Sequence, residues 1–385
     1  MRIALITDTY TPQVNGVTTI VRRIVEVLAR ARQHAVVVAP RYPDEPVVAT
    51  DSELRVPSLP FPPYRALRLS WPQPGRIARF LDAFAPDLVH VVTEGPLGLV
   101  GRRYALRRGV PLVTSFHTDF PQHSRYYGLG RLEPLIWQWL VWFHRPAQLV
   151  HTPGEAVRAE LARRGVARVR VWGNGVDTAV FDHRRRDAAF RERLGVPYGA
   201  ALVLHVGRLA AEKNLEVLVA AWTIAHEQLG EAAAFVFAGD GPIARRCAAA
   251  MPWALHLGFL EVPLLAALYA SADLCVLPSR TETCGLVALE AMASGLPVVA
   301  ADAGGFRESV ADARTGFLIP PDDVRGFASA IARLVLDPDL RRRMSEDARL
   351  AAVARSADDE NERLLDEYTV AAGRHPNEDR QWRAA

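Results

Sequence analysis

The sequence predicts an α/β protein with two doubly wound domains, each built from a parallel sheet with helices on both faces. Three observations predict this fold class. Short apolar segments alternate with helical stretches along most of the 385 residues. The alternation stops at a glycine-rich stretch, residues 173–177, and then restarts. The length also fits two domains of ordinary size.

The first domain is expected at residues 1–175. It begins with an apolar strand at residues 2–8, and a loop rich in turn residues then leads to an amphipathic helix at residues 17–32. Further strands are expected at residues 35–39, 87–92, 111–116 and 149–152. Residues 44–74 are rich in proline and are expected to form a loop.

The second domain is expected at residues 176–356, joined to the first by the glycine-rich stretch, which suits a hinge. Its strands are expected at residues 201–206, 234–238, 254–257, 274–277 and 298–301. One helix is expected at residues 215–228 and another from Gly285 onward. Residues 357–385 are expected to form a C-terminal helix followed by a frayed polar tail.

Composition excludes several classes of protein. The chain is 50% hydrophobic and 23% charged, which excludes a disordered or collagen-like polypeptide. No apolar run approaches the roughly 18–20 residues that span a bilayer, and Asp8 comes too early for a secretory signal peptide. The three cysteines are too few and too scattered for a disulfide framework or a zinc site. We therefore expect a protein of the reducing cytoplasm.

Charge is divided unevenly along the chain. Residues 1–170 hold 23 arginines and 13 acidic residues, which gives a net charge of +10. The remainder holds 23 basic and 30 acidic residues, which gives −7. A basic first half indicates an anionic surface as its partner, although a solvated basic face without a partner explains the same numbers.

Lys213 is the single lysine among 46 basic residues. A compositional bias toward arginine explains the other 45, and an ammonium is a compact point charge that a guanidinium does not reproduce. Lys213 is therefore a candidate functional residue. The alternative is a surface lysine retained by chance.

Loops that follow strands form the candidate site, because open α/β sheets bind ligands beyond the carboxyl ends of their strands. In the first loop, Asn15 and Gly16 let backbone N–H groups approach a phosphate at a helix N-terminus; an ordinary turn explains the same pair. The second loop carries Arg208 and Lys213, which can hold two phosphates and neutralise a departing diphosphate. A surface ion pair with Glu212 is the structural alternative.

The third loop carries two acids, Glu282 before the helix and Glu290 within it. Carboxylates accept hydrogen bonds from sugar or ribose hydroxyls. The backbone N–H groups of Cys284, Gly285 and Leu286 lie at the N-terminus of this helix and point toward a ligand.

The fourth loop places His117 at the end of a strand, at the cleft expected between the domains and opposite the two cations. This position favours a part in the reaction, although a lone histidine at a strand end is more often structural.

Six motifs add a family resemblance to this picture. They are TDTYTPQVNGV at 7–17, SFHTDF at 115–120, WGNGVD at 172–177, VGRLAAEKN at 206–214, AGDGP at 238–242 and ETCGLVALEAMASGLPVVA at 282–300. With them, nearly the whole chain resembles the family-four glycosyltransferases of the GT-B fold. That resemblance implies two Rossmann-like domains facing a central cleft, the first binding an acceptor and the second a nucleotide-sugar donor. It also implies that the C-terminal helix, expected at residues 357–372, returns to the first domain.

Within this family, the opening motif together with HTDF, SRYYG and WGNGVD most resembles bacterial mannosyltransferases that use GDP-mannose and build glycolipids. Plant-type sulfoquinovosyl lipid synthases share the same pattern. The implied activity is retaining transfer of mannose from GDP-mannose to a lipid or lipid-linked sugar, in glycolipid or surface glycan synthesis. The alternative is a glycolipid synthase that uses a UDP-sugar with a glucosyl, glucuronosyl or sulfoquinovosyl group.

The resemblance also implies roles for single residues. Gly16 corresponds to the glycine that abuts the diphosphate, and Arg208 and Lys213 correspond to the diphosphate clamp. Glu290 corresponds to the ribose ligand, and Glu282 to the group that contacts sugar hydroxyls.

Three other positions complete the comparison with the family pattern. His117 corresponds to the histidine close to the transferred sugar, and Asp119 to an adjacent polar position. Cys284 stands where an aromatic residue or leucine is usual. Asn174 stands where the lipid-mannosyl relatives tend to have arginine, which leaves the donor open.

No metal or other cofactor is expected, because Arg208 and Lys213 can neutralise the diphosphate. Asp337-Pro338-Asp339 matches the Asp-x-Asp pattern of metal-using transferases, but Pro and Asp are ordinary signals between two helices. A phosphorylase would need a lysine for pyridoxal phosphate, and Lys213 already has a place in the clamp. A non-catalytic sugar-nucleotide-binding protein is a remote alternative, and dispersed arginines argue against a nucleic-acid partner.

Residues 134–145 hold three of the eight tryptophans, in the basic half beside Arg125 and Arg131. Tryptophan and arginine together suit a bilayer interface, whereas a core helix is the alternative for this segment alone. With the charge of +10 and the resemblance to glycolipid-forming enzymes, we expect peripheral contact with the inner face of a membrane.

Overall fold

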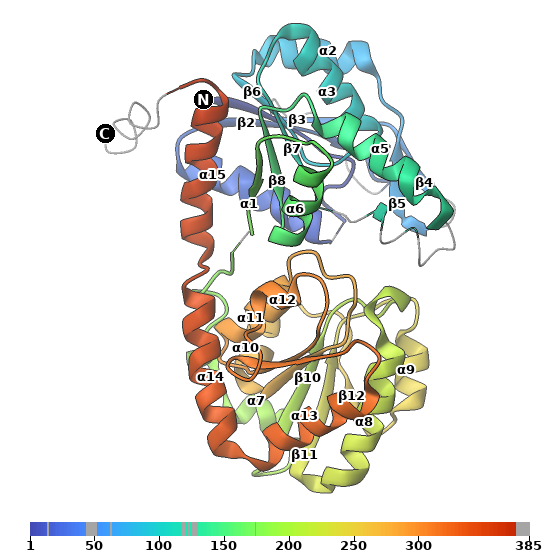
Figure 1. The fold of residues 1–385 in the computed structure, drawn as a ribbon, viewed down its shortest axis with the longest axis vertical. Coiled ribbons are helices and arrows are strands. Elements are labelled where there is room, and N and C mark those ends of the chain that lie inside the picture. The colour runs from blue at the N-terminus through green and yellow to red at the C-terminus, as the bar shows by residue number, and fades with distance from the viewer. Residues whose placement is uncertain are drawn as a thin grey trace. The chain divides into compact units, whose positions relative to one another are not determined.

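We describe residues 1–13, 15–43, 52–61, 64–117, 120–121, 124, 130–173 and 175–374 of a computed structural model. The chain divides into two compact units (Figure 1). Unit 1 comprises Met1–Gly173 and Asn361–Ala385, and unit 2 comprises Asn174–Glu360. The expected boundaries, after residues 175 and 356, lie within a few residues of these.

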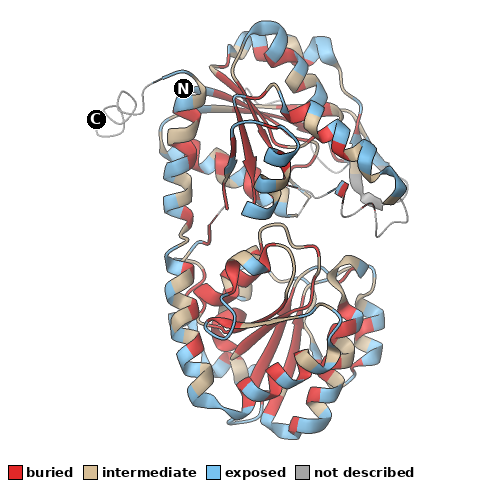
Figure 2. Ribbon diagram, viewed as in Figure 1, coloured by how far each residue is buried: buried red, intermediate tan, exposed pale blue. Residues whose placement is uncertain are grey.

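Unit 1 is built on a seven-stranded sheet in the order β3-β2-β1-β6-β7-β8-β9, and all neighbouring strands are parallel. The strands are β1 (Arg2–Ile6), β2 (His34–Pro40), β3 (Glu53–Val56), β6 (Leu88–Val91), β7 (Leu112–Ser115), β8 (Leu149–Thr152) and β9 (Val169–Val171). The central strands are buried on both faces, which explains their nearly continuous apolar sequences (Figure 2). The strand order reverses at β1, so the loops after β1 and β6 lie at a topological switch point.

Helices cover both faces of this sheet (Figure 1). One face packs against α2 (Pro74–Phe84), α3 (Pro96–Arg108), α5 (Glu133–His144) and α6 (Glu155–Arg163). The other packs against α1 (Gly16–Arg30) and α15 (Ala357–Ala371). Leu364, Leu365 and Tyr368 of α15 enter this second core. The core of unit 1 is thus completed by residues that follow unit 2 in the sequence.

The expectation of a loop at residues 44–74 is wrong for the part of this segment that the structure describes. β3 adds to the edge of the sheet, and β4 (Ser58–Phe61) pairs with β5 (Tyr64–Ser70) as an antiparallel hairpin. In β3, Leu54 and Val56 are buried whereas Glu53 and Arg55 are partly exposed. This period of two is typical of a strand with one buried face, and the nearby prolines favoured the prediction of a loop. Residues 44–51 and 62–63 lie outside the described residues.

Unit 2 contains a six-stranded parallel sheet in the order β12-β11-β10-β13-β14-β15. The strands are β10 (Ala201–Val206), β11 (Ala233–Ala238), β12 (Leu255–His256), β13 (Leu274–Leu277), β14 (Val298–Ala301) and β15 (Gly316–Ile319). The helices are α7 (Ala188–Arg193), α8 (Leu215–Leu229), α9 (Ala244–Ala250), α10 (Val262–Ser271), α11 (Leu286–Ala293), α12 (Phe306–Ser309), α13 (Val324–Leu336) and α14 (Pro338–Val353). They pack on both faces of the sheet and form two separate cores. Two doubly wound parallel sheets confirm the predicted fold class.

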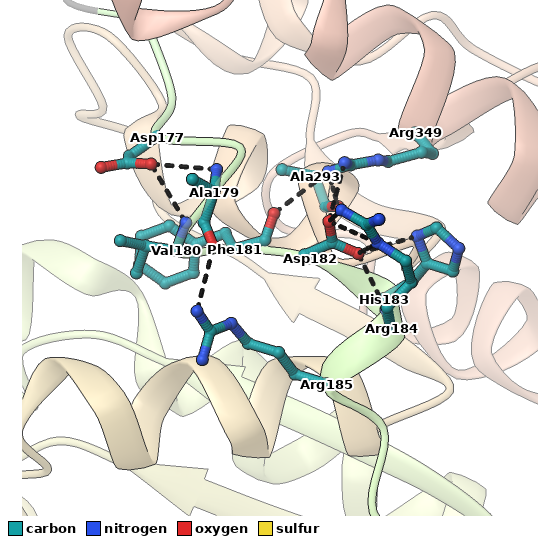
Figure 3. A network of polar contacts seen from close by, with 10 residues as sticks. All are labelled: Asp177, Ala179, Val180, Phe181, Asp182, His183, Arg184, Arg185, Ala293 and Arg349. Carbon is teal, nitrogen blue, oxygen red and sulfur yellow. Dashed lines mark hydrogen bonds and ion pairs between the residues drawn. The ribbon is translucent and has the colours of Figure 1, made fainter.

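Asp182 anchors the segment by which the chain enters unit 2 (Figure 3). Its buried carboxylate lies 2.6 Å from the guanidinium of Arg184 and 3.3 Å from that of Arg349 in α14. The hydrogen bonds from Arg184 hold the pKa of Asp182 well below its usual range. Arg349 also donates to the carbonyl groups of Phe181 and of Ala293 at the end of α11. This network ties the carboxyl end of α11 to α14 and to the entering segment.

Candidate functional site

The carboxyl ends of β10 and β13 form the switch point of unit 2, where the strand order reverses. The loop after β10 ends in a short 3₁₀ turn, Ala211–Lys213, followed by Asn214 in the left-handed conformation with φ 55°. The Asn214 amide donates to the carbonyl groups of Pro278 (3.3 Å) and Pro321 (2.8 Å), and Thr281 donates to Glu212 O (3.3 Å). These bonds hold the two loops together.

Lys213 and Glu282 meet at this point. The Lys213 ammonium donates to Oε1 of Glu282, and both side chains are largely buried. Arg208 is more exposed, and its guanidinium lies 3.9 Å from the carboxylate of Glu212. Lys213 and Glu282, both predicted as site residues, are therefore paired with each other. Arg208 pairs with Glu212, as expected if these cations formed a surface ion pair instead of a phosphate site.

Glycines allow these loops to approach closely. The backbone N–H of Gly305 donates to Glu282 O (2.7 Å), and a Cβ on Gly304 would lie only 2.3 Å from the same oxygen. A Cβ on Gly239 would lie 1.9 Å from Gly207 O, so the glycine at the end of β11 has a similar role. Contacts this short exclude any larger residue unless the backbone moves. The position of Glu282 thus depends on Gly304 and Gly305.

Glu290 lies on α11, which begins after Gly285 at φ 68°. The Tyr269 hydroxyl donates to Oε2 of Glu290 (3.2 Å). Burial and the charge of Glu290 raise the pKa of Tyr269 well above its ordinary value, so the hydroxyl remains a donor. Cys284, Gly285 and Leu286 lie at the N-terminus of α11, where the first N–H groups of a helix have no acceptor within it. The sequence-predicted residues of unit 2 therefore gather around the ends of β10 and β13.

His205 of β10 is a residue that sequence reasoning missed. Its Nδ1–H donates to Val276 O (2.8 Å), and its buried Nε2 has no hydrogen-bond partner among the described residues. Burial, with the charge of Lys213, lowers the pKa of His205 to about 4. A polar residue inside an otherwise apolar strand is the signal that could have identified it. His205 therefore places a neutral imidazole near the Lys213–Glu282 pair.

Asn15 and Gly16 belong to unit 1, where they begin α1. The Asn15 side chain accepts from Thr18 N (2.9 Å) and donates to the hydroxyl of Thr9 (2.8 Å), so it is an N-cap. A Cβ on Gly16 would meet no atom within 4 Å. The glycine is thus not required by local packing, and it leaves open space at the N-terminus of α1.

His117 follows β7 and is only 9% exposed. Burial and the nearby His151 lower its pKa to about 3, so the imidazole is neutral at physiological pH. Its Nε2 has no hydrogen-bond partner among the described residues. Asp119, Arg125 and Asn174 lie outside the described residues.

Asp8 lies two residues after β1 and was not identified as a site residue from the sequence. Its carboxylate accepts hydrogen bonds from Leu97 N (3.0 Å), Gly98 N (3.3 Å) and the Thr93 hydroxyl (3.0 Å). Burial raises its pKa. Asp8 therefore holds the N-terminus of α3 against the switch point of unit 1. An acid as the last residue of the strand predicted at residues 2–8 could have indicated this.

Among the described residues, no group of three His, Cys, Asp or Glu side chains is placed to hold a metal ion. Asp337, from the Asp-x-Asp match, accepts from Leu340 N (2.9 Å) and caps α14. None of the helices in the described ranges combines the length and apolar character needed to cross a bilayer.

Comparisons with known proteins give a consistent result for the two halves of the sequence. Residues 14–180 match the family described as Glycosyltransferase Family 4, and residues 187–351 match Glycosyl transferases group 1. A GDP-mannose-dependent alpha-mannosyltransferase of Mycolicibacterium smegmatis is 36% identical over 97% of this chain and 98% of its own length. A sulfoquinovosyl transferase of Arabidopsis thaliana is also 36% identical, over 76% of this chain and 58% of its own length.

Solved structures show the fold. A sucrose-phosphate synthase from Thermosynechococcus elongatus matches 95% of this chain and 98% of its own with a TM-score of 0.74 and 21% identity. The Anabaena HepE protein in complex with UDP-glucose matches 96% of this chain and 100% of its own, with a TM-score of 0.75 and 20% identity. The architecture is therefore GT-B, as the resemblance implied.

Proposed function

The chain belongs to the glycosyltransferases that combine a family 4 domain with a group 1 domain, and on this premise we propose that it transfers mannose from GDP-mannose to a lipid or lipid-linked sugar. One observation carries the proposal. Arg208, Lys213, Glu282 and Glu290 lie together around the carboxyl ends of β10 and β13. The 36% identity to a GDP-mannose-dependent relative along nearly the whole chain supports the choice of donor.

Lys213 and Arg208 bind the diphosphate of the donor in this proposal. Charge builds on the diphosphate as it departs, and fixed cations stabilise that charge in the transition state. Lys213 exchanges its partner Glu282 for a phosphate oxygen, which leaves the Glu282 carboxylate to accept from sugar hydroxyls. We propose that these two cations do the work of a metal ion, so that transfer requires none.

Glu290 binds the ribose hydroxyls of the nucleotide. The Tyr269 hydroxyl orients its carboxylate by donating to Oε2. The hydrogen-bond network around Arg349 fixes the carboxyl end of α11. Glu290, the proposed ribose-binding residue, is thus carried by a helix that is anchored at its carboxyl end.

His117 takes part as a neutral hydrogen-bonding group beside the transferred sugar. A pKa of about 3 means that the ring is a neutral imidazole and not an imidazolium at neutral pH, so it does not act as a general acid. The bond between the anomeric carbon and the diphosphate breaks while the acceptor oxygen bonds to that carbon on the same face. The acceptor proton passes to the departing phosphate oxygen, and the anomeric configuration is retained.

The acceptor is proposed to reach unit 1 from the inner face of a membrane. α5 turns Trp137 into the core, with 7% exposure, but leaves Trp139 at 38% and Trp142 at 47%. Leu132 and Leu135 are exposed on the same segment. We call Leu132, Leu135, Trp139 and Trp142 the α5 surface. Arg102 of α3 lies over the ring of Trp142 at 3.9 Å, so a cation accompanies the exposed aromatic groups.

A UDP-sugar donor is the second candidate. It is favoured by the 36% identity to a sulfoquinovosyl transferase and by the 29% identity to an alpha-monoglucosyldiacylglycerol synthase of Streptococcus pneumoniae. Both candidates share the same diphosphate and ribose contacts. They differ in the base and the hexose.

A donor panel tests the proposal. The purified chain, in EDTA, is given GDP-mannose, UDP-glucose, UDP-glucuronate and UDP-galactose, and binding and slow hydrolysis are measured with Lys213→Ala as the control. Binding and turnover of GDP-mannose alone are expected. Preference for a UDP-sugar would replace the donor and retain the reaction class, whereas no binding of any donor would overturn the proposal.

A further inference from the structure

Three histidines lie close together inside unit 1, at the carboxyl ends of neighbouring strands. His90 is the penultimate residue of β6, His151 is the penultimate residue of β8, and His117 follows β7 by two positions. His90 and His151 are fully buried, and their ring centroids are 5.7 Å apart. Polar side chains in strands covered on both faces are costly unless they find partners. His90 and His151 both have such partners.

The C-terminal helix α15 supplies one partner to each strand histidine. The hydroxyl of Tyr368 lies 2.6 Å from Nδ1 of His90, and Nε2–H of His151 donates to Oε2 of Glu367 at 2.8 Å. Burial and the charge of Glu367 raise the pKa of Tyr368 well above its ordinary value, so this hydroxyl is a donor. His90 therefore accepts a hydrogen bond at Nδ1 from the Tyr368 hydroxyl of α15.

The other side of His90 leads to the loop of His117. With Nδ1 accepting from Tyr368, the neutral imidazole carries its proton on Nε2, which lies 2.7 Å from the hydroxyl of Ser115. Burial, His151 and His117 all lower the pKa of His90, in keeping with a neutral ring. Ser115 is the last residue of β7 and stands two positions before His117. A continuous series of bonds thus joins α15 to the segment that carries His117.

We propose that Tyr368 and Glu367 are positioning residues for glycosyl transfer, which hold His117 in place through His90, His151 and Ser115. This rests on the proposed function, in which His117 lies beside the transferred sugar. Neither side chain touches substrate in this account. The C-terminal helix acts on the reaction because its docking on unit 1 fixes the tautomer and position of the buried histidines.

The test uses two variants in the full chain, Tyr368→Phe and Glu367→Gln. Phenylalanine retains the ring that packs against His90, at a centroid distance of 5.6 Å, and removes only the hydroxyl. Glutamine retains an oxygen acceptor, and the Glu367 side chain borders a surface hollow of about 570 Å³, so solvent reaches the altered group. The matched control is Glu362→Gln, the same change at an exposed position of α15.

Two measurements are made on each variant. The first separates kcat from donor KM. We expect kcat to fall on the order of tenfold in Tyr368→Phe, because misplacement of a reacting group is costly, while donor KM stays unchanged because the charged residues proposed to bind the diphosphate and the ribose belong to unit 2. The second is the imidazole ¹⁵N spectrum of His90 and His117, which reports the tautomers. It is expected to change in both variants and to stay unchanged in Glu362→Gln.

The two measurements distinguish this proposal from the proposed function. Wild-type kcat and unaltered imidazole spectra in both variants would overturn the positioning role. An equal loss in Glu362→Gln would also overturn it, because the effect would then reflect a general weakening of α15. If the wild-type chain transfers no hexose from any donor, the proposed function fails, while the spectra still show whether α15 controls the state of His117.

Discussion

The ammonium of Lys213 and the carboxylate of Glu282 form an ion pair where the loops after β10 and β13 meet. The two residues are 69 positions apart in the sequence, and the topology of the sheet brings them together. The pair explains why the single lysine stands where an arginine-rich composition would favour arginine. A compact ammonium fits between the two loops and can transfer its bond to a phosphate oxygen.

Replacing Lys213 tests this explanation. Lys213→Ala is expected to lower kcat on the order of 10²–10³-fold, because the departing diphosphate loses a fixed counter-charge. Lys213→Arg is expected to be impaired as well, since the planar guanidinium does not fit the same position. Arg246→Ala, which breaks the exposed pair with Glu216, is the control. Near-normal turnover in Lys213→Ala would contradict the role given to Lys213.

Gly304 offers a test of how Glu282 is positioned. Gly304 and Gly195 both have positive φ, 52° and 69°, so alanine at either position strains the backbone by about 1–2 kcal/mol. At Gly304 the added Cβ would also lie 2.3 Å from Glu282 O, whereas at Gly195 it would meet nothing within 4 Å. Donor affinity measured by calorimetry should therefore fall in Gly304→Ala and not in Gly195→Ala. Equal affinities in the two variants would show that the position of Glu282 does not depend on Gly304.

Tyr269→Phe removes one hydrogen bond from Glu290 and leaves the buried ring in place. A hydrogen bond to a charged group contributes about 1.5–3 kcal/mol, and part of this is expected to appear as a rise in donor KM. Steady-state kinetics with the full nucleotide-sugar checks it. Tyr198→Phe, at an exposed position, provides the comparison. A loss of kcat with unchanged KM would assign Glu290 to a role other than ribose binding.

The buried His205 predicts how stability depends on pH. Its pKa is about 4 in the folded chain and near 6.5 when exposed, so the unfolded state binds more protons between these values and stability falls as the pH is lowered. For this group the expected loss between pH 7 and pH 5 is about 2 kcal/mol. The free energy of unfolding, measured with denaturant at several pH values, should fall less steeply with decreasing pH in His205→Gln than in the wild type. The same dependence of the unfolding free energy on pH in both proteins would mean that His205 is protonated as readily in the folded chain as in the unfolded chain.

The α5 surface predicts binding to anionic vesicles. The double variant Trp139→Ser with Trp142→Ser is expected to sediment less with vesicles that contain anionic lipid. Added salt is expected to weaken wild-type binding, because exposed charges are screened within about 10 Å at 0.1 M salt. Tyr198→Ser, an exposed aromatic position in unit 2, should bind as the wild type does. Wild-type sedimentation of the double variant would place any membrane contact elsewhere.

The sequence was most informative where a local pattern determines structure. Strands at 201–206, 274–277 and 298–301 were predicted at their observed bounds, because short, mostly apolar runs bounded by turns are distinctive. β9 and β15 were missed, since they are short and partly exposed. The loops around Arg208, Lys213 and Glu282 could be predicted because open parallel sheets bind ligands in the loops that follow their strands.

Contacts between distant segments could not be predicted in the same way. Tyr368 and His90 are 278 positions apart, and nothing in either local sequence indicates the other. The histidines within the apolar strands β6 and β8 were the available signal. Their partners became apparent only when α15 was seen to pack on unit 1.

The composition of unit 1 from two separate stretches of chain has a consequence for synthesis. A ribosome completes all of unit 2, through Glu360, before it makes the residues of α15 that enter the core of unit 1. Until Leu364, Leu365 and Tyr368 emerge, one face of the first sheet is covered by α1 without α15 and exposes apolar surface. The unit that is translated first is therefore the last to finish folding, and an early stop before α15 would leave that unit prone to aggregation.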